Sequence, residues 1–210
     1  MKSSKEIKNS RESQLLDRFL AEAPFGGWQL KTLKTASKQC FDEPNLEEIC
    51  FPAGLKDVTL AFADRMDAEM TAAFRQQEGT LRVRDKVSTC VWLRLQAMQP
   101  YRESVRSLMG WLALPGNHLL AMQLMARTVD TIWHLCGDTA TDFNYYSKRA
   151  LLAGVYGSTL LYWLNDTSEG YADTHAFLQR RIADVMRIQT TKKRVQEFWA
   201  KTGLGKKKRA

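Results

Sequence analysis

The sequence contains few prolines and few cysteines: 5 prolines and 4 cysteines among 210 residues. The cysteines are Cys40, Cys50, Cys90 and Cys136, and they form no C-x-x-C pair and match no zinc-site spacing. A chain of this length can bury a hydrophobic core without disulfides or metal. We therefore expect four reduced thiols in a reducing compartment.

Long apolar runs are also missing. The longest apolar stretch, Ala150–Leu164, is shorter than the roughly 20 residues that a membrane-spanning helix needs. The first ten residues contain no apolar run of a secretory signal, and Glu6 and Glu12 argue against an organelle transit peptide. These features predict a chain that is not secreted and does not cross a bilayer.

The motifs of common catalytic sites are absent as well. The sequence contains no glycine-rich phosphate loop, no G-x-S-x-G elbow and no H-E-x-x-H pair. His134, Asp138 and Asp142 have helical spacing for a metal site, but Gly137 and Thr139–Thr141 are expected to break that helix. The neighbouring Glu47 and Glu48 have the pattern of surface charge. We therefore predict no catalytic residues, no metal and no enzymatic activity.

Positive charge is concentrated at the C-terminal end. Residues 190–210 hold eight basic residues against Glu197, a charge of +7 that leaves +1 of the total +8 for the rest of the chain. Ile188, Val195, Phe198 and Trp199 fall on one stripe of a helix, with the cations on the other side. An amphipathic basic helix suits a membrane surface, where each cation contributes about 1 kcal/mol. The alternatives are a solvated tail packed on the body and a tail that binds nucleic acid. The predicted membrane-contact residues are Lys192, Lys193, Arg194, Val195, Phe198 and Trp199.

Apolar periodicity is helical almost throughout, and no strand-like alternation appears. The pattern predicts an all-α fold of about ten helices. The expected ranges are Ser10–Glu22, Gln29–Gln39, Asn45–Cys50, Gly54–Gln77, Val83–Met98, Tyr101–Leu112, Asn117–Cys136, Phe143–Leu164, Tyr171–Arg187 and the basic tail. Pro24 with Gly26 and Gly27 should end the first helix, and Asn45 should cap the third.

Two short helices between a first helix and a long one form the layout of TetR-type regulators, in which the second and third helices make a helix-turn-helix. A DNA-reading helix needs cations and hydrogen-bonding side chains, whereas Asn45–Cys50 offers Glu47 and Glu48. Lysines in the second helix leave DNA binding disfavoured rather than excluded. We divide the chain into a degenerate helix-turn-helix region (1–53), a lipid-binding helical bundle (54–189) and a membrane-contact segment (190–210).

The segment Ala150–Leu164 is apolar all round, which predicts a buried helix. It carries small residues, among them Gly154 and Gly157, and glycine in a helix needs a packing reason. Either neighbouring helices approach closely there or room is left for an apolar ligand. Downstream of Thr128, aromatic residues including Trp133, Tyr145 and Tyr146 flank a polar turn, as core anchors or as an exposed binding patch.

Two segments, Thr128–Tyr156 (TVDTIWHLCGDTATDFNYYSKRALLAGVY) and Leu161–Met186 (LYWLNDTSEGYADTHAFLQRRIADVM), resemble the ninth coenzyme-Q protein family of ubiquinone biosynthesis. The upstream LALPGN of Leu112–Asn117 is similar to the family too, and FPAG of Phe51–Gly54 resembles its F-P-G-G turn. The resemblance is specific across residues 112–186 and looser over the N-terminal helices.

The resemblance implies a TetR-like, non-enzymatic homodimer that has given up DNA binding and holds phospholipid or an isoprenoid quinone precursor. It implies a di-iron demethoxyubiquinone hydroxylase as partner and membrane contact by a C-terminal amphipathic helix. The lack of a transit peptide suggests a bacterial, cytoplasmic member, peripheral on the inner face of the membrane. The lipid site is predicted at Leu120, Leu124, Leu152, Gly154, Tyr156, Gly157, Leu160 and Phe177. The partner patch is predicted at Asp130, Ile132, Trp133, Tyr145, Tyr146 and Arg149.

Three residues depart from the family's pattern. Tyr145 stands where some members have Trp, Ile132 where some have Met, and His175 where D-T-W is usual. These departures bear on the strength of partner binding. The alternative functions are a TetR-type transcriptional regulator with a hydrophobic effector and a helical scaffold with no ligand.

Overall fold

The computed structural model describes residues 4–41, 43–77, 81–137 and 143–201, with side chains described from Asn9 to Arg187 except within 143–145. This described part is helical and contains no strand, which confirms the all-α prediction. The α-helices are α1 (Ser4–Gly26), α2 (Leu30–Cys40), α3 (Leu46–Cys50), α4 (Leu55–Arg75), α5 (Val83–Met98), α6 (Arg102–Leu112), α7 (His118–Leu135), α8 (Phe143–Trp163) and α9 (Ala172–Lys201). Short 3₁₀ turns, η1 (Gln99–Tyr101) and η2 (Glu169–Tyr171), precede α6 and α9.

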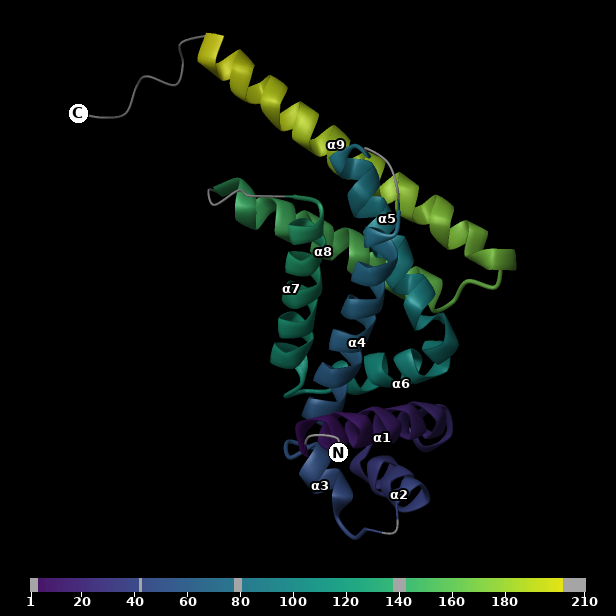
Figure 1. Ribbon diagram of the computed structural model, residues 1–210. Coiled ribbons are helices and arrows are strands. Elements are labelled where there is room, and N and C mark those ends of the chain that lie inside the picture. The colour runs from purple at the N-terminus through teal and green to yellow at the C-terminus, as the bar shows by residue number, and fades with distance from the viewer. Residues whose placement is uncertain (1–3, 42, 78–80, 138–142, 202–210) are drawn as a thin grey trace, which may run out of the picture. The chain divides into compact units, whose positions relative to one another are not determined.

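The chain forms two compact units, residues 1–145 and residues 146–210. In the first unit α1, α2 and α3 cluster together, and α4 leads from them to pack beside α5 and α7 (Figure 1). The predicted boundaries at residues 53 and 189 separate regions of different expected function, and the division into compact units does not test them. The described α-helices number nine rather than about ten, because the predicted helix 171–187 and the tail helix are one continuous α9.

Helix α1 passes through Pro24, where the sequence predicted a break. Proline lacks the N–H that would bond to the carbonyl of Leu20, one turn earlier. That carbonyl instead accepts a hydrogen bond from the Ser104 hydroxyl of α6 at 2.5 Å. The tertiary contact satisfies the orphaned group, so the helix continues to Gly26.

The core of the first unit contains a run of aromatic rings. Phe19 meets Trp28 edge to face at 4.8 Å between ring centroids, and Phe62 lies 6.2 Å from Trp28 and 5.8 Å from Tyr101. The Trp28 indole donates to the Thr59 hydroxyl at 3.0 Å. These contacts fix α1, the start of α2 and the first turns of α4 against one another.

Helix α3 differs from its prediction in two details. Asn45 adopts a left-handed conformation with φ 57° and its side chain makes no capping bond; asparagine tolerates that conformation better than most residues. Glu47 is buried rather than part of a charged surface, whereas Glu48 is exposed.

In the second unit Asp166 closes the turn between α8 and α9. Its carboxylate accepts bonds from the backbone N–H and hydroxyl of both Ser168 and Thr174, at 2.5 to 2.8 Å. Burial would raise the pKa of Asp166, but these hydrogen bonds outweigh it and lower the pKa to about 2. The carboxylate thus holds the first turn of α9 in place.

Helix α8 is not buried all round, which corrects the prediction for Ala150–Leu164. Leu152 and Trp163 are buried, whereas Leu161 is 54% exposed. Gly154 is exposed, and a Cβ added to it would meet no heavy atom within 4 Å. Close helix packing therefore does not explain this glycine.

Candidate ligand groove and partner patch

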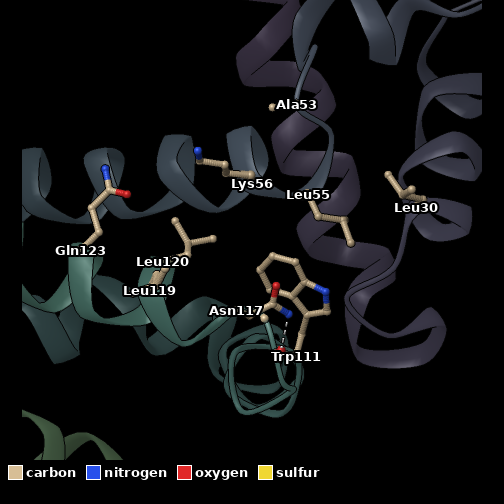
Figure 2. A pocket seen from close by; sticks show the side chains of 10 residues that line it. Leu30, Ala53, Leu55, Lys56, Trp111, Asn117, Leu119, Leu120 and Gln123 are labelled. Atoms are coloured by element: carbon tan, nitrogen blue, oxygen red, sulfur yellow. Dashed lines mark hydrogen bonds between the residues drawn. The ribbon is translucent and has the colours of Figure 1, made fainter.

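An open groove of about 430 Å³ lies in the first unit, where the start of α2, the turn from α3 to α4 and the corner between α6 and α7 meet (Figure 2). Small-molecule sites commonly have about 300–1,000 Å³. The lining residues are Leu30, Ala53, Leu55, Lys56, Trp111, Gly116, Asn117, Leu119, Leu120 and Gln123.

The turn before α4 depends on Gly54. Its φ of 58° and ψ of −127° belong to a region that other residues rarely adopt. A Cβ there would lie 2.9 Å from Cδ2 of Leu30. The next turn is fixed by the Asp57 carboxylate, which accepts from the backbone N–H of Ala53 at 2.7 Å. The absence of a Cβ at Gly54 thus leaves room for the Leu30 side chain, which lines the groove.

The opposite wall is the corner LALPGN, where α6 ends and α7 begins. The Asn117 side-chain amide donates to the Trp111 carbonyl at 2.8 Å and ties the two helices together (Figure 2). Leu119 and Leu120 follow in the first turn of α7. This corner lies in one of the segments that carried the sequence resemblance.

Four leucines and an indole supply half of the lining residues, and Lys56 supplies its charge. The lining contains no carboxylate, histidine or thiol, so it offers no acid–base pair and no nucleophile. Its chemistry suits the apolar part of an amphiphile beside a cation.

A second hollow of about 370 Å³ gathers Arg75, Lys86 and His134 near the ends of α4 and α7. Cations at helix C-termini offset the partial negative charge of the helix dipole. That role accounts for Arg75 and His134, whereas Lys86 lies near the N-terminus of α5; we assign no ligand to this hollow.

The eight predicted lipid-site residues fall in both units. In the first unit Leu120 lines the groove and Leu124 is half-buried one turn further along α7. The other six lie in the second unit: Leu152, Tyr156 and Leu160 are buried, Gly157 and Phe177 are half-buried, and Gly154 is exposed. That these six residues form one cavity with Leu120 stays a prediction.

Phe177 has partners that the sequence did not indicate. Its ring stacks on Tyr162 at 4.5 Å between centroids, and the guanidinium of Arg181 lies 5.2 Å from the same ring. These contacts give Phe177 a structural role in joining α8 to α9.

The predicted partner patch is exposed only in part. The side chain of Asp130 is exposed and Tyr146 is 71% exposed, whereas Ile132 is fully buried. Trp133 and Arg149 are half-buried. The side chain of Tyr145 lies outside the described residues, and the patch as a binding site stays a prediction.

The predicted membrane-contact residues lie in the last turns of α9, which extends to Lys201. The side chains of Lys192, Lys193, Arg194, Val195, Phe198 and Trp199 lie outside the described residues. Asp138 and Asp142 do so too, and the described part of the chain contains no cluster that could hold a metal.

Sequence reasoning missed a buried ion pair. Arg94 donates through Nε to the Asp67 carboxylate at 2.6 Å, and the Thr128 hydroxyl donates to the same carboxylate at 3.2 Å. The sequence does contain a signal for this pair, because Arg94 lies on the apolar stripe of Val91, Leu95 and Met98 in α5. The pair joins α4, α5 and α7, and its burial indicates a structural role.

Cys40, Cys50, Cys90 and Cys136, all among the described residues, form no disulfide. A hydrogen bond with Cys136, together with burial, raises the pKa of Cys90 above its usual 9.0. A raised pKa disfavours the reactive thiolate, so Cys90 is poorly suited to nucleophilic catalysis.

Comparisons with known proteins agree with the resemblance seen in the sequence. The COQ9 family model matches residues 119–189. The ubiquinone biosynthesis protein COQ9, mitochondrial, of Xenopus tropicalis is 31% identical, with 88% of this chain and 62% of that protein covered. COQ9-B of Xenopus laevis is 30% identical, with 88% and 67% covered, and human COQ9 is 29% identical, with 88% and 62% covered. The chain thus spans about 62% of the first of these relatives.

A TetR transcriptional regulator from Nitrosomonas europaea has the same fold. Its crystal structure aligns with a TM-score of 0.65 over 82% of this chain and 95% of that one, at 18% identity. This likeness confirms the TetR-like fold and does not extend to function.

Proposed function

The chain belongs to the COQ9 family of ubiquinone biosynthesis proteins, and we propose that it serves there as a non-enzymatic protein that binds a quinone-pathway lipid and presents it to a demethoxyubiquinone hydroxylase. The observation that carries the proposal is the family match over residues 119–189, which includes Leu120 of the groove, Phe177 and the predicted partner patch.

Lipid binding is further supported by the lining of the groove. It combines leucines and Trp111 with a single charged side chain, Lys56. Each methylene that leaves water for an apolar site contributes about 0.8 kcal/mol. Phospholipid or an isoprenoid quinone precursor offers many such methylenes.

Mass spectrometry of an organic extract from the purified protein tests lipid binding directly. We expect phospholipid or isoprenoid to be recovered at a fixed ratio to protein, and Leu120→Asp to lower that ratio. An extract without lipid, from protein that also ignores anionic vesicles, would overturn the proposal.

A hydroxylase partner is supported by the exposure of Asp130 and Tyr146. Exposed aromatics of this kind often carry much of the binding energy at an interface. We expect Tyr146→Ala to weaken the complex with a di-iron hydroxylase by at least about tenfold, equal to roughly 1.4 kcal/mol. Phe25→Ala is the matched control, because Phe25 is 90% exposed on α1. Equal effects of the two variants would argue against the patch.

Membrane attachment is proposed through the basic end of α9. The curated relatives named above are mitochondrial proteins. Among the described residues, no helix has the length and hydropathy for a membrane span. Replacing Lys192, Lys193 and Arg194 with Gln should lower binding to anionic vesicles.

We also propose a homodimer, for which sedimentation equilibrium is the test.

The alternative function, a TetR-type regulator, predicts duplex DNA binding that weakens steeply with salt. The five-residue α3, with Glu47 buried and Glu48 exposed, favours no such binding. Specific retention of a duplex at moderate salt would make the regulator the better account.

A further inference from the structure

Beside the groove, the exposed face of α2 carries lysines that the proposed function does not use. On α2, Lys31, Lys34 and Lys38 are all exposed and share one stripe within about 60° of helix rotation. That stripe adjoins Leu30, which lines the groove, and Lys56 of α4 lines the same groove. Figure 2 shows Lys56 and Leu55 standing between Leu30 on one side and Leu119 and Leu120 on the other.

These four lysines differ from most arginines of the same unit, though not from Arg75 and Arg82. Arg11, Arg65 and Arg94 pair with carboxylates, as do Arg18, Arg106 and Arg127. Within the described residues none of the four lysines forms an ion pair. Their charge is therefore available to an anionic surface.

The same face exposes large apolar side chains. Leu30 is 54% exposed, Leu119 is 66% exposed and Met122, one turn further along α7, is 59% exposed. Single exposed leucines are ordinary on protein surfaces. Exposed Leu30 and Leu119 both line this groove together with Lys56, and the lysine stripe of α2 adjoins Leu30, which is the pattern of an interaction surface.

The residue types identify the partner. Protein–protein interfaces are enriched in tyrosine, tryptophan and arginine and depleted in lysine. Lysine with leucine, and few fixed hydrogen-bond donors, instead suits a fluid anionic lipid surface, into which apolar side chains insert while lysines stay at the headgroups.

We propose that this lysine-rimmed face (Leu30, Lys31, Lys34, Lys56, Leu119 and Met122) is a membrane-contact surface for anionic phospholipid, separate from the basic end of α9. It rests on the proposed function in one respect, that the protein works at a membrane. Contact at this face would open the groove towards the bilayer from which lipid enters.

The test is flotation of the full chain with phosphatidylcholine vesicles, with and without phosphatidylglycerol. The face variant carries Lys31→Gln, Lys34→Gln and Lys56→Gln. We expect it to bind anionic vesicles roughly ten- to a hundredfold more weakly, since each lysine contributes about a factor of five at such a surface.

A control variant removes the same charge elsewhere in the unit, with Arg75→Gln, Arg82→Gln and Lys86→Gln. It should stay within about threefold of the native protein, because charges beyond a Debye length are screened. A third variant, Leu119→Ser with Met122→Ser, leaves the charge unchanged and should also bind more weakly. All changed residues except half-buried Lys86 are exposed, and unchanged melting by circular dichroism confirms folding.

Three results would overturn the inference. One is that the face and control variants weaken vesicle binding equally, because the loss would then follow from net charge alone and not from this face. Another is a face variant that binds vesicles as the native protein does, while the α9 variant (Lys192, Lys193 and Arg194 to Gln) no longer binds; membrane contact would then belong to α9 alone. If lipid is still recovered by extraction in that case, the proposed function stands. The last is dissociation of a dimer by Leu119→Ser with Met122→Ser, which would assign the face to a second copy. Conversely, lipid-free protein whose face variant still loses vesicle binding would refute the lipid-binding part of the proposed function and leave this inference standing.

Discussion

Removing one partner of the Asp67–Arg94 pair should destabilise the protein strongly. The side chains of Arg94 and Asp67 are only 7% and 13% exposed. Asp67→Ala would leave the Arg94 guanidinium buried without its carboxylate, and Thr128 without its acceptor. Breaking a buried pair in this way costs about 3–5 kcal/mol.

The structure supplies a matched control, because Asp64 and Arg127 also join α4 to α7. Their side chains are 56% and 44% exposed. An exposed pair contributes about 0–1 kcal/mol, so Asp64→Ala should lower the free energy of unfolding by no more than that.

Urea unfolding followed by circular dichroism measures both free energies. The double variant Asp67→Leu with Arg94→Met removes both charges and should cost far less than the sum of the single changes, since an apolar pair of similar volume often replaces a buried ion pair at little cost. The reasoning would be refuted if Asp67→Ala cost less than about 1 kcal/mol, or if the double variant cost as much as the two single variants together.

Three further changes test local features. Gly54→Ala should cost about 1–3 kcal/mol of unfolding free energy because of its backbone conformation and its contact with Leu30, whereas Gly110→Ala, in an open helical position, should stabilise by about 0.5–1 kcal/mol; urea midpoints that move alike would contradict this. The folded-state pKa of Asp166, about 2, lies below the ordinary 3.8, so its stabilisation is complete above pH 4 and is lost as pH falls towards 2; Asp166→Ala should flatten that part of the stability curve and cost about 0.5–2 kcal/mol at neutral pH. In a thiol-reagent time course Cys40, which is half-exposed, should react first and the buried Cys90 only on unfolding; fast modification of Cys90 in the folded protein would show that it is not held as described.

Helical periodicity is a local property, and for that reason the sequence located most of the helices. Val83–Met98 was predicted at both ends, and α7 and α8 to within one residue. The failure at Pro24 had a non-local cause: Ser104, eighty residues away in the chain, supplies the hydrogen bond that proline removes. The join in α9 was missed because a change from mixed to basic composition was interpreted as a boundary, although charge does not interrupt a helix.

Candidate sites show the same division. Charge, residue type and family resemblance pointed to a lipid, a partner and a basic tail from the sequence alone, because each is written in local composition or in matched segments. Only the tertiary structure decided that Leu120 lies in a groove with Leu30 and Lys56, that Ile132 is buried and that Gly154 faces open space. Burial and pairing depend on which helices meet, and residues as distant in sequence as Leu30 and Leu119 meet only when the chain has folded.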